Sequence, residues 1–139
     1  MSTHEVVTTW TGDMAFEAGV TGHTVRMDAT ADFGGKDSGC RPKQLLLAAV
    51  AGCSGMDVVS LLRKTRQPLT FFDIKVEGEL SEGHPVHYST ITMVYRFKDG
   101  DALDRDKVEK AVSMSQERYC GVSALFKMAI PVTWRIEYL

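Results

Sequence analysis

The stretch RPKQLLLAAVAGCSGMDVVSLLRKTR, Arg41 to Arg66, decides the fold of this 139-residue chain. Pro42 suits the first turn of a helix, where its missing N–H costs nothing, and only two glycines interrupt the run. Apolar residues occupy every side of the predicted helix, and such a helix is normally buried all round. At about 1.5 Å per residue it would extend roughly 35 Å, the breadth of a small domain. Cys53 lies at its centre, so its thiol is either inert packing or a protected reaction centre.

The bulk composition is that of a globular protein, with 44% hydrophobic and 24% charged residues and a net charge of −2. The length suits one domain, residues 1–139, with a real core and is too short for two ordinary ones. Binding to nucleic acid or to an anionic membrane would need a basic surplus or patch, and the charge balance gives it no support. We therefore expect neither partner.

The chain shows neither an apolar run of about eighteen residues nor the basic and apolar regions of a secretory signal, so we expect no membrane span. Its three widely spaced cysteines are not typical of a disulfide scaffold. A reducing compartment, the cytoplasm, is the expected location. Thiols in such a compartment tend to be catalytic, redox-active or simply buried.

The pattern along the chain predicts an α+β fold, ordered βββ-α-ββ-αα-β, without repeats. Gly-Asp and Thr-Gly pairs separate the first strands, and Asp104 is a predicted helix N-cap. Alternation of apolar and polar residues marks the final strand. The predicted strands are Glu5–Thr11, Met14–Gly19, Gly22–Thr30, Leu69–Leu80, Val86–Phe97 and the segment from Val132 to Tyr138. A helix face of Val108, Ala111, Val112 and Ser115 and a turn over Val122–Ala129 complete the set.

So few elements cannot cover every side of an all-apolar helix. A small curved sheet covers one side and the second helix covers part of another, which leaves apolar surface facing water. We infer a homodimer with a large apolar interface around the long helix. The alternative is a monomer whose C-terminal helices cover everything.

Glycines flank the central thiol, in the run AVAGCSGMDVV. Each glycine destabilises a helix by about 1 kcal/mol relative to alanine, but its missing side chain leaves space beside the helix. Another backbone or a small ligand can then approach the sulfur of Cys53. A plain helix-crossing contact explains the same glycines equally well.

A second cysteine, Cys120, lies at a predicted helix break in ERYCGVSAL. A thiol at the start of a helical turn meets free N–H groups and partial positive charge, and both favour the thiolate. The alternative is a buried free cysteine at a bend, behaving as a small hydrophobe. Cys40 falls in a glycine-rich loop, where we expect it to be exposed and without a role.

Paired, Cys53 and Cys120 suggest thiol redox chemistry. A thiolate attacks a peroxide oxygen and becomes a sulfenic acid, which a second thiol converts to a disulfide. This requires a lowered thiol pKa, usually a nearby cation, and Cα atoms within roughly 7 Å. A metal site is the weaker alternative, because no CxxC is present and His84 and His87 lie at a predicted hairpin tip.

Three segments together carry a family resemblance: GHTVRMDA, RPKQLLLAAVAGCSGMDVVSLLRK and ERYCGVSALFKMAIPVTWRIEY. Nearly the whole chain resembles the OsmC/Ohr family, the osmotically inducible and organic-hydroperoxide-resistance proteins, and within it the YhfA-like subgroup. The resemblance implies curved antiparallel sheets around a long central helix in an intertwined homodimer. Each site of that dimer takes residues from both subunits.

The resemblance also implies an activity, a thiol-dependent peroxidase acting on organic hydroperoxides. Cys53 matches the peroxidatic cysteine and Cys120 the resolving one. An external dithiol, such as a lipoylated protein, reduces the disulfide, and no metal or other cofactor is used.

The chain departs from the family pattern around the expected thiolate-stabilising arginine. The family holds that arginine with a glutamate near the helix proline, whereas here Lys43 and Gln44 follow Pro42. Arg26 is the only arginine before the helix region. Asp57 lies one turn beyond the Cys53 thiol, where an uncompensated carboxylate would raise the thiol pKa. Arg118 is the candidate to compensate it.

Two functional hypotheses remain open. The first is a peroxidase for organic hydroperoxides, favoured by the apolar residues Leu46, Ala49, Val50 and Met56 around the thiol. The second is a binding or stress-response protein that keeps the fold but turns over poorly. A structural Cys53–Cys120 disulfide is the weakest idea for a chain without export signals.

Overall fold

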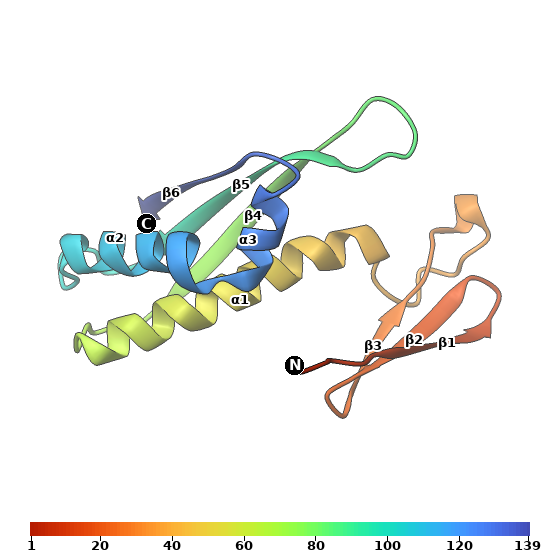
Figure 1. Cartoon of the computed structure of the whole chain (residues 1–139), viewed down its shortest axis with the longest axis horizontal. Helices are drawn as coiled ribbons and strands as arrows, with labels where there is room; N and C mark the ends of the chain where they lie inside the picture. The colour runs from red at the N-terminus through yellow and green to blue at the C-terminus, as the bar shows by residue number, and fades with distance from the viewer. The chain divides into compact units, whose positions relative to one another are not determined.

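The computed structural model describes all 139 residues, and its contacts divide the chain into two compact units, Met1–Leu46 and Leu47–Leu139. We describe each unit by itself. The elements follow the predicted order along the chain (Figure 1). That the chain forms one domain remains a prediction.

The first unit is a three-stranded antiparallel sheet made of β1 (Val7–Gly12), β2 (Ala15–Val20) and β3 (His23–Met27). Thr21 and Gly22, the two residues between β2 and β3, both have positive φ. Two such residues make the tight turn whose twist matches the flanking strands. The predicted Thr-Gly turn is therefore confirmed.

The loop after β3 contains a short 3-10 helix, Ala31–Phe33, and is organised by one buried carboxylate, that of Asp28. Its oxygens accept from the backbone N–H groups of Ala29 (2.7 Å), Lys36 (3.2 Å) and Ser38 (3.1 Å), and from the Ser38 hydroxyl (2.6 Å). These hydrogen bonds, led by those of Ser38, hold the pKa of Asp28 well below its usual range. The loop is thereby folded back onto itself just before the long helix.

The second unit contains the sheet β4 (Phe72–Leu80), β5 (Tyr88–Phe97) and β6 (Val132–Tyr138), with β5 in the middle. β4 and β5 are antiparallel, as a hairpin must be, but β6 runs parallel to β5. The expectation of purely antiparallel sheets is therefore wrong for this sheet. The chain reaches β6 through helices, which gives it the length that a parallel return requires.

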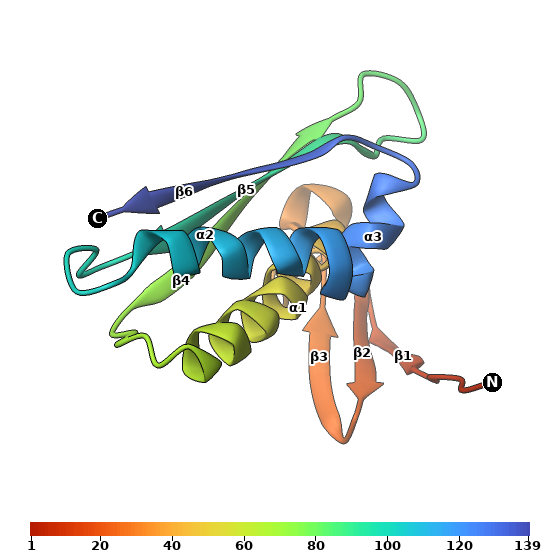
Figure 2. The same cartoon turned by 60° about the vertical axis from the view of Figure 1, so that its left-hand side comes forward.

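Helices α1 (Pro42–Lys64) and α2 (Arg105–Met114) lie on the same face of this sheet, as Figure 2 shows. Asp104 caps α2 as predicted, accepting from two backbone N–H groups of the first turn. A π-helix, Ser115–Tyr119, continues α2, and α3 (Gly121–Lys127) follows Cys120. The core between helices and sheet contains Val50, Val58, Leu62, Ile91, Met93, Tyr95, Phe97, Val108 and Val112.

The burial of α1 within one chain is confined to a single stripe. Val50, Ser54, Val58 and Leu62, spaced four residues apart, are buried. Met56, on another side of the helix, is 76% exposed. The expectation of burial all round is therefore wrong for the isolated chain, and apolar helix surface remains uncovered.

By length and composition alone, α1 is apolar enough to cross a membrane, with a mean hydropathy of 2.0 over its best 18-residue window. The helix contains no unbroken apolar run of about eighteen residues, and the expectation of no membrane span stays a prediction. The same test is passed by core helices of soluble proteins, so the finding is weak evidence for a membrane span.

Candidate functional site

Cys53 lies in the middle of α1, half-buried against the core of the second unit. The two glycines near it have different surroundings. A Cβ on Gly55 would meet the Ile74 Cδ1 atom of β4 at 3.4 Å, which is an ordinary van der Waals contact. A Cβ on Gly52 would meet nothing within 4 Å. Gly55 thus faces the sheet and Gly52 faces open space, and packing within one chain requires neither glycine.

Cys120 lies at the junction of the π-helix and α3, where its backbone is extended (φ −76°, ψ 99°). Its N–H donates to the Ser115 carbonyl at 2.8 Å, and its Sγ accepts from the Ser123 N–H at 3.4 Å. The predicted helix break is confirmed, and the thiol acts as the N-cap of α3.

The structure brings the two predicted cysteines together. Burial raises the pKa of the Cys120 thiol to about 11, and the neighbouring Cys53 thiol adds to the rise. The Ser123 N–H acts in the opposite direction but is outweighed. Of the two interpretations of Cys120, the buried free cysteine at a bend fits its ionisation, because desolvation outweighs the effect of the helix start. Both thiols are free.

Asp57 lies one helical turn beyond Cys53, and its carboxylate accepts from the Ser115 hydroxyl at 2.9 Å. The expected compensation by Arg118 is absent, since that side chain is exposed and makes no ion pair with Asp57. The negative charge of Asp57 is a further contribution to the raised pKa of Cys120. A hydroxyl, not a guanidinium, thus satisfies the carboxylate.

A chain of buried hydroxyls continues from Ser115 into the core. The Ser115 hydroxyl lies 2.8 Å from that of Ser54, which lies 2.5 Å from the Tyr95 hydroxyl. The amide Nε2 of Gln116 donates to the Tyr95 oxygen at 2.6 Å. One set of directions satisfies every oxygen: Gln116 donates to Tyr95, Tyr95 to Ser54, Ser54 to Ser115, and Ser115 to Asp57.

Sequence reasoning missed most of this network. Ser115 lay on a predicted buried helix face, and a hydroxyl there was a signal for a buried polar partner. Gln116 gave no such signal, because a regular helix would turn the next residue away from the core. The π-helix buries both neighbours, which periodicity of 3.6 residues cannot foresee.

Arg26 belongs to the first unit, on β3. Its guanidinium pairs with the Glu17 carboxylate at 3.0 Å, across the strand pair in which these two residues face each other. It also donates to the Ser38 hydroxyl at 3.0 Å. The first turn of α1 contains no acidic residue, as the sequence indicated. Glu17, which sequence reasoning did not single out, is the acidic partner that Arg26 has.

The cysteine and histidine side chains to which the sequence analysis assigned no role lie where expected. Cys40 is exposed, and its Sγ donates only to the Arg26 carbonyl, at 3.3 Å. His84 and His87 are exposed in the loop between β4 and β5. No group of three or more His, Cys, Asp or Glu side chains could hold a metal ion.

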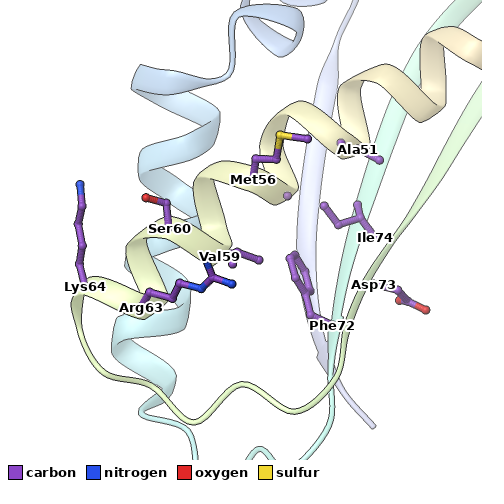
Figure 3. Close-up of a pocket in the computed structure, with 11 residues that line it drawn as sticks. Ala51, Met56, Val59, Ser60, Arg63, Lys64, Phe72, Asp73 and Ile74 are labelled. Atoms are coloured by element: carbon purple, nitrogen blue, oxygen red, sulfur yellow. The ribbon is translucent and has the colours of Figure 1, made fainter. Parts of the chain in front are cut away.

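An apolar groove of about 790 Å³ runs along the side of α1 that faces β4 (Figure 3). Met56 and Val59 of the helix and Phe72 and Ile74 of the strand form its walls. Basic side chains, those of Arg63 and Lys64, lie at its end where α1 terminates. The groove can accept a hydrophobic body with a polar or anionic end.

Comparison with known proteins places this arrangement in a family. Residues 35–135 match the family model described as OsmC-like protein. Protein YhfA of Escherichia coli K12 is 32% identical over 116 residues, which are 84% of this chain and 83% of that protein.

Solved structures agree with the sequence match. A hypothetical protein from Aquifex aeolicus VF5 superposes with a TM-score of 0.83 at 27% identity, covering 100% of this chain and 99% of that chain. The organic hydroperoxide resistance protein OhrB of Bacillus subtilis has the same fold, with a TM-score of 0.66, 20% identity and 98% of both chains covered. The chain therefore belongs to the OsmC-like protein family.

Proposed function

We propose that this protein is a thiol-dependent peroxidase that reduces organic hydroperoxides with Cys53 and Cys120. The observation that carries the proposal is that two thiols, distant in sequence, are close enough in the fold for Cys53 to affect the ionisation of Cys120. Cys53 is half-exposed, which suits the attacking thiol, and the buried Cys120 next to it would be the resolving thiol. OhrB of Bacillus subtilis, of the same fold, is named an organic hydroperoxide resistance protein.

The proposed cycle has three steps. The Cys53 thiolate attacks one peroxide oxygen and breaks the O–O bond, giving a sulfenic acid and an alkoxide that takes a proton to become the alcohol. The Cys120 thiol then displaces hydroxide from the sulfenic acid, forming a disulfide, and its proton completes a water molecule. An external dithiol, such as a lipoylated protein, reduces the disulfide by exchange. The cycle uses no metal or other cofactor.

Arg26 is the candidate cation of this chemistry, by family resemblance, and Glu17 is the group that would orient it. Arg26→Ala should therefore slow hydroperoxide turnover, whereas Arg135→Ala, an exposed arginine of β6 that also pairs with a glutamate, should not. Equal rates for both variants would remove Arg26 from the site.

We further propose that the protein is a homodimer in the cytoplasm. The exposed apolar side of α1 supports the dimer, because a helix of this composition is normally covered. A second copy in the groove beside Met56 would cover it. The cytoplasmic location follows from the cycle, which needs its thiols kept reduced between turnovers.

The decisive experiment follows cumene hydroperoxide consumption with dihydrolipoate as the dithiol. The wild type should turn over repeatedly, and Cys53→Ser should abolish turnover. Cys40→Ser, at an exposed thiol, is the matched control and should keep the wild-type rate. No consumption by the wild type would end the proposal.

A binding protein without efficient turnover is the second candidate, because Asp57 lies near both thiols and no cation pairs with it. The two functions differ in the reactivity of Cys53. Alkylation of the Cys53 thiol that is half-complete well below about pH 7 supports the enzyme, and one above about pH 8.5 supports the binder.

A further inference from the structure

Gln116 is buried and joins three parts of the second unit. Its side-chain Nε2 donates to the Tyr95 hydroxyl of β5 at 2.6 Å. Its Oε1 accepts from the Ser123 hydroxyl of α3 at 2.7 Å, and its backbone carbonyl accepts from the Lys127 ammonium at 2.7 Å. Only 3% of the residue is exposed.

These bonds fix the segment that carries Cys120. Ser123, which donates its hydroxyl to Gln116, also donates its N–H to the Cys120 sulfur at 3.4 Å. On the other side, the Cys120 N–H is bound to the Ser115 carbonyl. The Cys120 thiol thus lies between two hydrogen-bonded ends, and Ser123, which binds its sulfur, is itself held by Gln116.

Burying an amide side chain is unfavourable unless each of its polar atoms has a hydrogen-bond partner. An apolar side chain of similar size would pack here without that requirement. The amide differs in that it can donate to β5 and accept from α3 at once. The π-helix turns Gln116 into the core beside Ser115, so that both neighbours serve the network.

We propose that Gln116 is a positioning residue that holds the first turn of α3, and with it the Cys120 sulfur, in the orientation facing Cys53. The inference rests on the proposed function, because it concerns the second, disulfide-forming step. Gln116 takes no part in bond making. It acts through Ser123 on the angle at which the Cys120 thiolate meets the Cys53 sulfur.

The test uses the full-length Cys40→Ser chain and forms the Cys53–Cys120 disulfide without peroxide. Dithiobis(nitrobenzoate) first converts the half-exposed Cys53 to a mixed disulfide and releases one thionitrobenzoate. Cys120 then loses its proton to solvent and attacks the Cys53 sulfur. That attack expels the second thionitrobenzoate, whose release reports the closing rate.

Gln116→Leu should leave the first release at the parent rate and slow the second by about tenfold or more, since small misalignments of reacting atoms cost large factors in rate. Ser123→Ala should do the same, because it removes the other end of the bond and keeps the backbone N–H. Val108→Ala, a buried change in the preceding helix, is the control for loss of stability and should leave both phases unchanged.

The double variant of Gln116→Leu and Ser123→Ala should close no more slowly than either single variant, because both changes remove one bond. Closing at the parent rate in both single variants would overturn the inference, as would slowing factors that multiply. If Gln116→Leu does not fold, Ser123→Ala carries the test alone.

The assay separates this inference from the proposed function. A parent chain that closes its disulfide but consumes no hydroperoxide would refute the peroxidase and leave the role of Gln116 standing. A parent chain that never releases the second thionitrobenzoate would overturn both.

Discussion

Replacing Tyr95 by phenylalanine tests whether the buried hydroxyl chain stabilises the fold. The ring is fully buried, and its hydroxyl bonds Ser54 at 2.5 Å and Gln116 at 2.6 Å. Each lost hydrogen bond costs about 1 kcal/mol net. Ser54 keeps its bond to Ser115, and the Gln116 amide keeps a contact to the Met93 sulfur at 3.0 Å, so neither is fully orphaned. We therefore expect Tyr95→Phe to lower the free energy of unfolding by about 2 kcal/mol.

Tyr88→Phe is the matched control, since Tyr88 lies in the same strand and burial alone, with no hydrogen bond, raises the pKa of its hydroxyl. It should change the free energy of unfolding by less than about 0.5 kcal/mol. Both variants are compared with the wild type by urea unfolding at one protein concentration, because association would add to the apparent stability. Equal midpoints for Tyr95→Phe and Tyr88→Phe would refute the hydroxyl chain.

Further predictions concern charge, pH and packing. Asp57→Asn should lower the pKa of the Cys120 thiol, because it removes a charge that raises it, and faster iodoacetamide labelling of Cys120 at fixed pH reports this. Burial raises the pKa of the Cys120 thiol from 9.0 to about 11. The contribution of the neutral thiol to the free energy of unfolding is therefore complete below pH 9.0 and falls as the pH rises through this interval. Unfolding free energies of wild type and Cys120→Ser across that range should converge as the pH rises. Gly52→Ala should stabilise a monomer by about 1 kcal/mol, because no atom lies near the added Cβ. The same change should weaken a dimer packed on this face of α1. Calorimetry measures the stability and sedimentation measures the association. Gly78→Ala should lower the melting temperature, since its Cβ would come within 2.4 Å of the Tyr88 ring, and an unchanged temperature would contradict the packing.

The sequence was sufficient to predict the order of the elements, because hydrophobic periodicity and turn residues act locally. The Asp104 cap and the break at Cys120 were predictable for the same reason. The parallel placement of β6 was not, since strand direction depends on where the chain returns and not on the strand itself.

The candidate site was predictable only in part. The two cysteines were found because their surroundings are unusual for a strong helix and a helix break. The sequence left the ionisation of Cys120 open between a stabilised thiolate and a buried neutral thiol, because burial depends on the whole fold while a helix start is visible locally. Glu17 and Gln116 were missed for a related reason: their roles come from a cross-strand partner and from a π-helix.

The central claim is that hydroperoxide converts Cys53 and Cys120 into a disulfide. The direct measurement is mass spectrometry of the reduced protein after one equivalent of cumene hydroperoxide. We predict a loss of two hydrogen masses and a cross-linked peptide pair containing Cys53 and Cys120, with Cys120→Ser gaining one oxygen at Cys53 instead. An unchanged mass, or oxidation confined to Cys40, would contradict the account.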